Sequence, residues 1–327
     1  MDVKNKQPMP NIPGLRRELV RISKPQKPAP PRSRVIVPPR PVPRPPRVMP
    51  LNVSGRFKPS QIDLRSAKLP ALPPATVETR HPMSMLHVFL WKWNQASFRE
   101  VYTMQHVDAC VRMLRPALEG IPHKIHLITD DRYMAPDGID VHDLWTDHDD
   151  VANASGWHLP SCYRRLKLFD MATLESMGVK KGERAASLDL DVAVTGSLKN
   201  IVYRKERFVS WGVPGTYHPR VFNGSFWMFT AGDLQHIWDT FDPAESPRRA
   251  IKTGFLGSDQ GWLSLNLARS GDAHGVRFPD IASYPREVRR QRALHRETRM
   301  VFFHGAQKPW HPNVQRESPW ITRYWKG

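Results

Sequence analysis

The chain has 327 residues and a formal net charge of +18, and 40% of its residues are hydrophobic, so it can form a large buried core. No stretch approaches the ~18 apolar residues of a membrane span, and no apolar segment follows the N-terminal basic residues, so neither a transmembrane helix nor a secretory signal is expected. Cys110 and Cys162 are too few for a disulfide framework or a zinc site. They indicate free thiols in a reducing compartment, and we expect a cytoplasmic protein.

The positive charge is concentrated in the first quarter of the chain. Residues 1–80 hold 17 Lys/Arg against 4 Asp/Glu, together with 18 of the 32 prolines, and show no apolar period. Proline lacks a backbone donor and favours extended geometry, and so few apolar residues cannot offset the entropy of ordering. Residues 1–82 are therefore predicted to be a disordered basic tail. It is either a solvated linker or an electrostatic tether to an anionic partner such as nucleic acid or membrane lipid.

From residue 83 to the C-terminus, apolar strands alternate with segments of helical spacing. In chain order we expect a strand at 85–90, a helix at 101–118, a strand at 124–129, a helix at 163–177, strands at 185–194 and 226–229, helices at 234–241 and 260–268, and a strand at 300–303. This alternation predicts an α/β layered sheet in which ligands bind at the carboxyl ends of the strands.

A pair of acidic residues interrupts the apolar segment 185–194. Asp189 and Asp191 stand two residues apart, and on a strand their side chains would point to the same face. Two carboxylates in apolar surroundings repel each other and are poorly solvated, so they persist with a cation between them or water beside them. A hard divalent ion, Mn²⁺ or Mg²⁺, fits this arrangement. A second Asp-x-Asp, Asp147 to Asp149, lies in a polar run and is read as a solvated loop.

Three later segments add groups that suit the same chemistry. Asn223 stands at the entry to an apolar strand, Asp259 and Gln260 stand at a helix N-terminus, and His304 to Trp310 carries an imidazole, a glycine and Lys308 just after a strand. Cleavage of a sugar–diphosphate bond develops negative charge on the leaving oxygen. A divalent cation and a lysine can stabilise that charge while amides orient the sugar.

The ordered set of motifs from residue 85 to 310 resembles the family-8-like retaining glycosyltransferases, which include glycogenin and bacterial lipooligosaccharide galactosyltransferases. The matching segments are Arg165–Leu168, Leu188–Val192, Phe222–Ser225, Asp259–Gln260 and His304–Trp310. The resemblance implies a GT-A fold, a Rossmann-like mixed sheet that binds a nucleotide-diphosphate sugar, with UDP as the expected carrier. No single motif is specific, but their order is.

The resemblance also implies roles for individual residues. Asp189 and Asp191 would bind the metal, Arg165 is the donor-binding basic residue, and Lys308 would bind the diphosphate. Asn223, Asp259 and Gln260 would contact the donor sugar or line its reacting face. Gly305 belongs to the diphosphate-binding motif. The family's metal-binding histidine stands three residues before that glycine, where this chain has Phe302, so His304 is a displaced candidate for a metal ligand. A second departure from the family is that Gly178–Arg184 adds length between Arg165 and the two acids.

The nucleotide base is expected near the first two strands. Stacking or polar contacts there could come from Trp91, Trp93, Asp130 and Asp131, each of which could equally be a core or surface residue. For the sugar, retention could arise through Asp259 or Gln260 stabilising an oxocarbenium-like state, or through attack of the acceptor on the leaving-group side. The sequence does not choose between them.

The acceptor is less defined than the donor. A basic stretch precedes the last motif and is read as a solvated helix or as a polyanion-binding surface; it comprises Arg286, Arg289, Arg290, Arg292, Arg296 and Arg299. A glycan or a modified DNA base would suit it. The alternative function is a nucleic-acid-binding protein whose transferase-like domain is inactive. A nucleotidyltransferase is disfavoured, because Leu90–Gln95 lacks the glycines of a phosphate loop.

Overall fold

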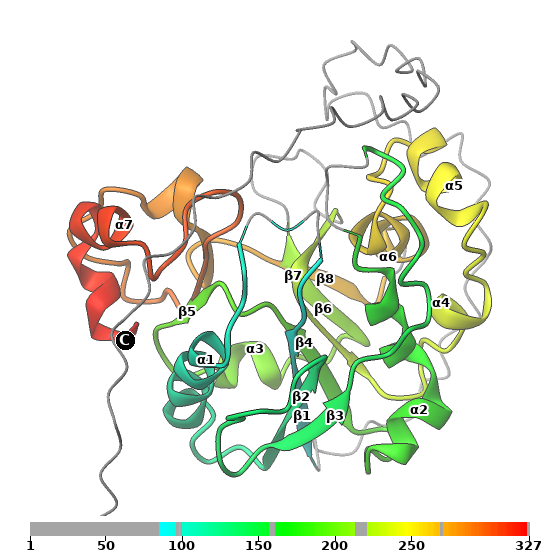
Figure 1. The fold of residues 1–327 in the computed structure, drawn as a ribbon, viewed down its shortest axis with the longest axis horizontal. Coiled ribbons are helices and arrows are strands. Elements are labelled where there is room, and N and C mark those ends of the chain that lie inside the picture. Colours follow the sequence, from blue (N-terminus) through cyan, green and yellow to red (C-terminus); the bar gives the residue numbers. More distant parts are fainter. Residues whose placement is uncertain are drawn as a thin grey trace, which may run out of the picture. The chain divides into compact units, whose positions relative to one another are not determined.

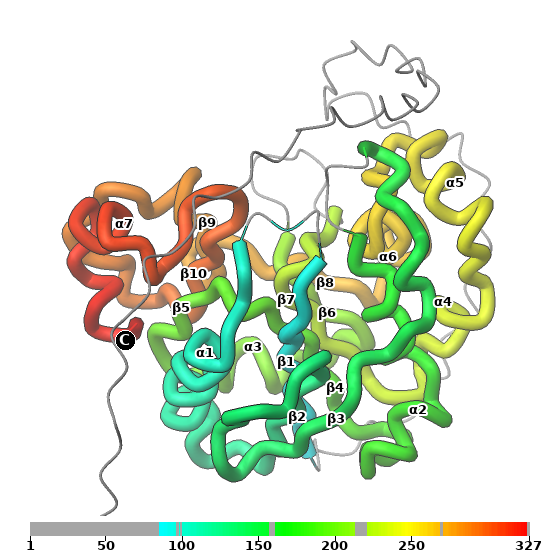
Figure 2. Tube along the Cα trace, in the orientation of Figure 1, coloured from blue at the N-terminus to red at the C-terminus, as the bar shows by residue number. Residues whose placement is uncertain are grey.

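The computed structural model describes residues 85–95, 98, 100–156, 161–212, 221–268 and 271–325. The predicted basic tail, residues 1–82, lies outside the described residues. The described part confirms the expected α/β organisation, in which helices cover a mixed central sheet (Figures 1 and 2). No helix in these ranges is both long enough and apolar enough to cross a bilayer.

The central sheet has seven strands in the order β3-β2-β1-β4-β7-β6-β8. Their bounds are β1 (Leu86–Lys92), β2 (His123–Thr129), β3 (Asp140–Asp143), β4 (Arg184–Leu188), β6 (Phe208–Gly212), β7 (Phe222–Thr230) and β8 (Ala273–Val276). The first four in spatial order are parallel, β7 is antiparallel to both β4 and β6, and β8 is parallel to β6. The carboxyl ends of β1, β2 and β4 therefore share one edge, where a ligand site is expected.

A second, three-stranded sheet has the order β5-β10-β9. Its strands are β5 (Val192–Val194), β10 (Met300–Phe302) and β9 (Ile281–Ser283). All three strands are fully buried, and they share one apolar cluster with α1 (Met104–Ala117) and α3 (Lys199–Val202). The chain passes from the central sheet to this small sheet between β4 and β5. The site described below is built at that crossing.

Side-chain alternation along β1 divides the core between the two faces of the central sheet. Val88 and Leu90 belong to the cluster that includes α1 and the small sheet, whereas Phe89 and Trp91 belong to the opposite cluster. That second face is covered by η2 (Tyr163–Phe169), α2 (Met171–Ser176), α4 (His236–Asp239), α5 (Ser246–Lys252) and α6 (Asp259–Leu267). The C-terminal segment continues through η3 (Tyr284–Val288), α7 (Pro312–Glu317) and η4 (Pro319–Arg323).

Three predicted elements differ from the observed ones. The predicted strand at 185–194 is two strands in two sheets, because the chain leaves the central sheet after Leu188. The predicted helix at 163–177 is interrupted at Asp170, whose extended backbone ends η2 and whose carboxylate caps α2 through the Thr173 amide. The basic stretch from Arg286 is also not one helix, since η3 ends at Val288.

A row of three imidazoles, two of them buried and one half-buried, crosses the parallel strands away from the carboxyl edge. His87 and His126 are joined ring to ring at 2.9 Å, His126 and His142 at 3.0 Å, and Nε2 of His87 lies 3.0 Å from the Glu183 carboxylate. Since that carboxylate accepts, neutral rings satisfy every contact when each histidine donates from Nε2 to its neighbour. Burial is the main cause that lowers the pKa of all three rings, and it lowers that of His126 to about 3. The lowered pKa values favour the neutral form of all three imidazoles in the folded protein.

We expect this row to make the protein sensitive to acid. A histidine whose folded pKa lies below its unfolded value of about 6.5 stabilises the fold above that pH. Its contribution falls as the pH drops, by up to about 1.4 kcal/mol per pH unit for each proton bound on unfolding. His126→Gln should therefore flatten the decline in unfolding free energy between pH 6.5 and 4.5 in urea titrations. The exposed His295→Gln is the control, and parallel curves for parent and His126→Gln would contradict the expectation.

Candidate active site

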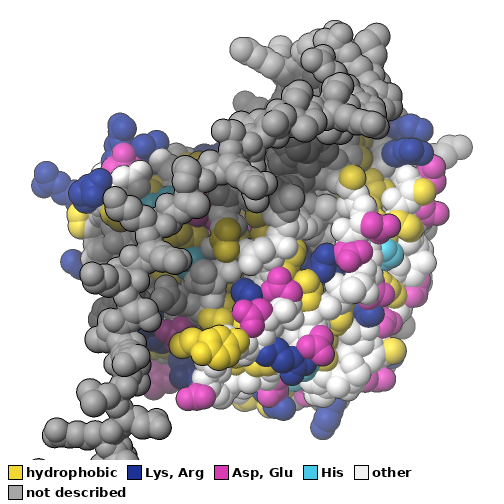
Figure 3. Space-filling view, in the orientation of Figure 1, with side chains coloured by type: hydrophobic (Ala, Val, Ile, Leu, Met, Phe, Trp, Pro, Cys, Tyr) yellow, Lys and Arg dark blue, Asp and Glu magenta, His cyan; other side chains and the backbone are white. Residues whose placement is uncertain are grey.

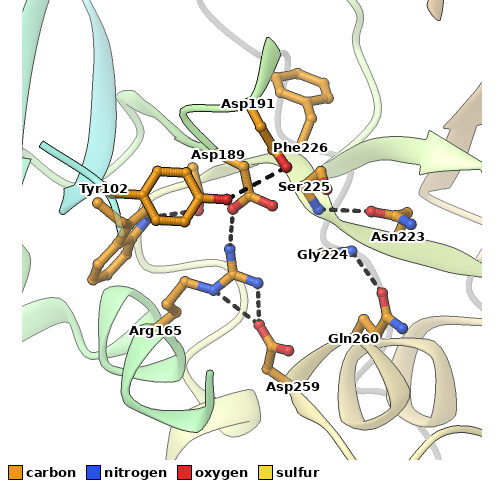
Figure 4. A network of polar contacts seen from close by, with 12 residues as sticks. Tyr102, Arg165, Asp189, Asp191, Asn223, Gly224, Ser225, Phe226, Asp259 and Gln260 are labelled. Atoms are coloured by element: carbon orange, nitrogen blue, oxygen red, sulfur yellow. Dashed lines mark hydrogen bonds and ion pairs between the residues drawn. The ribbon is translucent and has the colours of Figure 1, made fainter. Parts of the chain in front are cut away.

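The two acidic residues Asp189 and Asp191 occupy the link between β4 and β5. The Asp189 amide donates to the Ser225 carbonyl of β7 at 2.9 Å, and the Asp191 carbonyl accepts from the Phe303 amide after β10 at 2.9 Å. The expectation that a strand holds both acids was wrong, because neither residue is in a strand. Figure 4 nevertheless shows the two carboxyl groups beside each other. The Asp189 backbone is bonded to the central sheet and the Asp191 backbone to the chain after the small sheet, and the two parts meet at this link.

Arg165, from η2, joins the first acid to the start of α6. Its Nη1 donates to Oδ1 of Asp189 at 2.7 Å, and its Nε and Nη2 donate to Oδ2 of Asp259 at 3.0 and 2.5 Å (Figure 4). The side chains of Arg165 and Asp259 are each only 4% exposed. A buried guanidinium of this kind persists because its planar donors meet carboxylates on two sides.

The electrostatics of this trio follow from burial and charge. Burial alone would lower the pKa of Arg165, but Asp259 and Asp189 raise it well above its usual value, so it stays a cation. Burial raises the pKa of Asp189; Arg165 opposes that rise and the nearby charge of Asp191 adds to it. The charge of each acid therefore disfavours ionisation of the other.

Lys308 neutralises the second acid. Its ammonium lies 2.5 Å from Oδ2 of Asp191, 3.3 Å from the Phe303 carbonyl and 3.4 Å from the Tyr102 hydroxyl. Lys308 is 5% exposed and Asp191 6%, so this ion pair is buried. The Tyr102 hydroxyl also lies 3.5 Å from Oδ2 of Asp191 (Figure 4). Burial and then Asp191 raise the pKa of Tyr102, so it stays a neutral phenol.

The segment 223–225 leaves the regular ladder of β7. Its pairing with β6 shifts between Ser210 and Trp211, and the Ser210 hydroxyl donates to the carbonyls of Asn223 and Phe226 at 3.2 and 2.8 Å. Bulges of this kind redirect backbone next to functional sites. Here the Gly224 amide donates to Oε1 of Gln260 at 3.0 Å, and the Ser225 amide donates to Oδ1 of Asn223 at 2.8 Å.

His304 is near the aspartates but its ring is engaged elsewhere. Its Nε2 lies 2.8 Å from the Ser283 hydroxyl, and its ring centroid lies 5.8 Å from that of Trp211. Burial lowers its pKa, followed by the charge of Arg286, so the ring favours the neutral state. The described residues contain no group of three or more His, Cys, Asp or Glu side chains placed to hold a metal ion. His304 therefore does not complete a three-ligand cluster with the two acids.

The residues expected near the nucleotide base divide into core and surface. Trp91 is 5% exposed, donates its indole N–H to the Ser187 hydroxyl at 2.8 Å and packs against the rings of Trp93 and Trp145. It packs as a core residue, which is one of the two interpretations that the sequence left open. Asp130 retains a 38% exposed side chain and accepts from the buried Lys92 at 3.0 Å. Gly305 has a φ of +81°, which favours glycine at the turn after β10.

The structure thus brings together most of the candidate site. Asp189, Arg165 and Asp259 form one contact chain, and Asp191 and Lys308 form another beside it. Tyr102 was missed by sequence reasoning, because a single tyrosine before a helix has no pattern that distinguishes it. Only the packing of the segment before α1 against the β4–β5 link reveals its contact with Asp191.

No family model and no curated protein matches this chain. Among solved structures, it is similar to the galactosyltransferase LgtC in complex with donor and acceptor sugar analogs, at a TM-score of 0.49 and 11% identity. The match covers 73% of this chain and 95% of LgtC. An active-site mutant of LgtC matches with a TM-score of 0.49 and 12% identity over 73% of this chain and 93% of that one. Similarity of this degree assigns no activity to this chain.

Arg165 should be essential for the stability of the site. Arg165→Met leaves the buried Asp259 and the partly exposed Asp189 without their shared cation, and we expect the unfolding free energy to fall by about 3–5 kcal/mol. Adding Asp259→Asn should restore much of this loss in urea unfolding, because it removes the buried unpaired charge. Arg248→Met, which breaks an exposed pair with Glu245, should change little. The absence of any recovery in the double variant would contradict the charge-bridging role of Arg165.

Gly224 should tolerate no side chain. A Cβ built on Gly224 lies 2.7 Å from Nη2 of Arg165, and that guanidinium cannot retreat because carboxylates hold it on both sides. We expect Gly224→Ala to lower the unfolding free energy by about 1–3 kcal/mol, as overpacked sites do. Gly271→Ala is the matched control, since a Cβ there meets no atom within 4 Å. Equal stability of the two variants would show that Arg165 is not held in place.

Proposed function

We propose that residues 83–327 form a GT-A-type glycosyltransferase that is metal-dependent, retains anomeric configuration and takes its sugar from a nucleotide diphosphate, with UDP as the expected nucleotide. The observation that carries the proposal is the convergence of Asp189, Asp191, Arg165 and Lys308 at the carboxyl end of β4. Two acids and two cations at one strand end suit a phosphate group bound through a divalent ion. The ordered motifs from residue 85 to 310 support the same assignment.

The donor set suits Mn²⁺ or Mg²⁺ as a two-carboxylate site. Asp189 and Asp191 would hold the ion with hard oxygen ligands, and such ions often complete their coordination with water and substrate phosphates. When bound, the ion would supply positive charge to the leaving diphosphate. His304 would join these ligands only through Nδ1, because Ser283 already contacts its Nε2.

The chain's own residues have distinct roles in the proposed transfer. Lys308 carries a buried positive charge next to the acids and would stabilise the leaving oxygen. Arg165 orients Asp189 and adds a second cation on the diphosphate side. Gln260 uses its carbonyl oxygen on the Gly224 amide, which leaves its amide N–H groups to contact the sugar, together with Asn223.

Asp259 would act by positioning Arg165. Its Oδ2 accepts two bonds from that guanidinium, and the residue is 3% exposed. A carboxylate in such an ion pair is a weak nucleophile, since its charge is already stabilised. This favours retention either through stabilisation of the reacting carbon by Gln260 or through acceptor attack on the leaving-group side.

The acceptor is proposed to be a glycan or a modified DNA base. Five arginines of the stretch before the last motif are exposed: Arg286, Arg289, Arg290, Arg292 and Arg296. Figure 3 shows Lys and Arg side chains gathered over the part of the surface where Figure 1 places α7 and its neighbouring turns. Such a surface suits a polyanion. The same arginines support the alternative, a nucleic-acid-binding protein with an inactive domain.

The two unpaired cysteines suit a reducing compartment such as the cytoplasm.

Release of free nucleoside diphosphate from a panel of nucleotide sugars with Mn²⁺ tests the proposal. We expect slow hydrolysis of one or two donors, abolished by a chelator, and a fall on the order of 100-fold in Asp191→Asn, because the leaving group loses its main charge stabilisation. Asp149→Asn, in the second Asp-x-Asp, is the control and should match the parent. The proposed metal site is wrong if Asp191→Asn works as fast as the parent. Salt-sensitive DNA or RNA binding, lost on deleting residues 1–80, with no turnover of any donor would favour the inactive-domain alternative.

A further inference from the structure

The ammonium of Lys308 is held against Asp191 by three separate groups. A carboxylate, a backbone carbonyl and a phenol surround it, from Asp191, Phe303 and Tyr102, at 2.5, 3.3 and 3.4 Å. An ammonium has three donors, so each one has an acceptor here. The fold itself therefore stabilises the bond between Lys308 and the acid that would bind a metal.

Asp189 is compensated in the same way. Arg165 occupies its Oδ1 at 2.7 Å, so each of the two acids already has a positive partner from the chain. Asp189, Asp191 and Asp259 carry three negative charges against the two positive charges of Arg165 and Lys308, so the internal cations cancel most of the charge that would attract a divalent cation. Such an ion also meets the repulsion of an ammonium that is 5% exposed and poorly screened by water.

The protein also offers few ligands of its own. The ring of His304 is bonded to Ser283, and the described part of the chain has no cluster of three metal-binding side chains. An ion at Asp189 and Asp191 would thus need oxygens from another source. A nucleoside diphosphate supplies both those oxygens and a negative charge that Lys308 can accept in place of Asp191.

We propose that Lys308 makes divalent-cation binding at Asp189 and Asp191 conditional on the nucleoside diphosphate. Without the nucleotide the ammonium neutralises Asp191 and opposes the ion. With the nucleotide bound, the ammonium would contact the phosphate oxygens instead of Asp191, and the Asp191 carboxylate would be available to the ion. This inference rests on the proposed function, and it adds a condition. The ion binds only together with the diphosphate, because Lys308 otherwise neutralises Asp191.

Calorimetric titration of the full-length chain with Mn²⁺ tests this, first alone and then with UDP, GDP, ADP or CDP present. We expect the parent to bind Mn²⁺ at least 10-fold more tightly with one of these nucleotides than without. Lys308→Gln keeps a donor for Asp191 but removes the charge, so Mn²⁺ alone should bind about 10-fold more tightly than to the parent. The gain from nucleotide should shrink in this variant. Lys308→Arg keeps the charge and should bind Mn²⁺ alone as weakly as the parent.

The outcomes separate this inference from the function on which it rests. If Lys308→Gln binds Mn²⁺ alone no more tightly than the parent, while nucleotide still strengthens binding to the parent, the role of Lys308 is overturned and the metal site stands. If neither protein binds Mn²⁺ under any condition, the proposed metal-dependent function is overturned as well. Asp191→Asn should abolish the binding seen in either protein, which shows that the titration reports this site. Lys308→Met provides a second uncharged variant if Lys308→Gln does not fold.

Discussion

The guanidinium of Arg165 joins three elements that are far apart in the sequence. It reaches from η2 to the link after β4 through Asp189 and to the first residue of α6 through Asp259. The contact with Asp259 is buried and the contact with Asp189 is partly buried, so the loss of the guanidinium would leave uncompensated charge in a poorly solvated place. The position of the first acid, the entry to α6 and the close approach of Gly224 all depend on this one side chain.

The second acid is positioned by different means, and the contrast accounts for the shape of the site. Asp191 precedes β5, and its carbonyl accepts from the Phe303 amide after β10. Its position therefore depends on the small sheet rather than on the central one. Lys308 comes from the loop that follows β10. The end of β4 and the helix η2 present Asp189 and Arg165, the small sheet and its following loop present Asp191 and Lys308, and the site forms where these parts meet. A ligand that bridges both acids would also bridge both sheets.

The sequence predicted the elements whose apolar pattern is local. The first two strands, the helix before the second strand and the helix beginning at Asp259 match their expected places to within about three residues. It did not predict β3, whose four residues Asp140–Asp143 contain one apolar side chain, because an edge strand needs no apolar run. Nor did it predict the break after Leu188. That break depends on pairing with β7 and β10, which lie far along the chain.

The candidate site shows the same division. The two acids were selected because charged groups within an apolar segment are costly unless they are paired. Arg165 and Lys308 were selected through the order of the motifs and the resemblance that this order carries. Residue types and order were not enough to place Trp91 in the core or to find the partner of His304, since those outcomes depend on side-chain direction. The partners found in the structure changed the interpretation most. Asp191 has Lys308 to itself and Asp189 shares Arg165 with Asp259, so the chemistry of both acids depends on what displaces or supplements these internal cations.

The central claim is that Asp189 and Asp191 together hold a divalent cation against a diphosphate. Anomalous diffraction from crystals of the protein grown with Mn²⁺ and a nucleoside diphosphate tests it most directly. We predict one strong manganese peak within coordinating distance of both carboxylates and of phosphate oxygens. A peak at any other place in the protein, or nucleotide bound at these residues with no manganese beside it, would contradict the account.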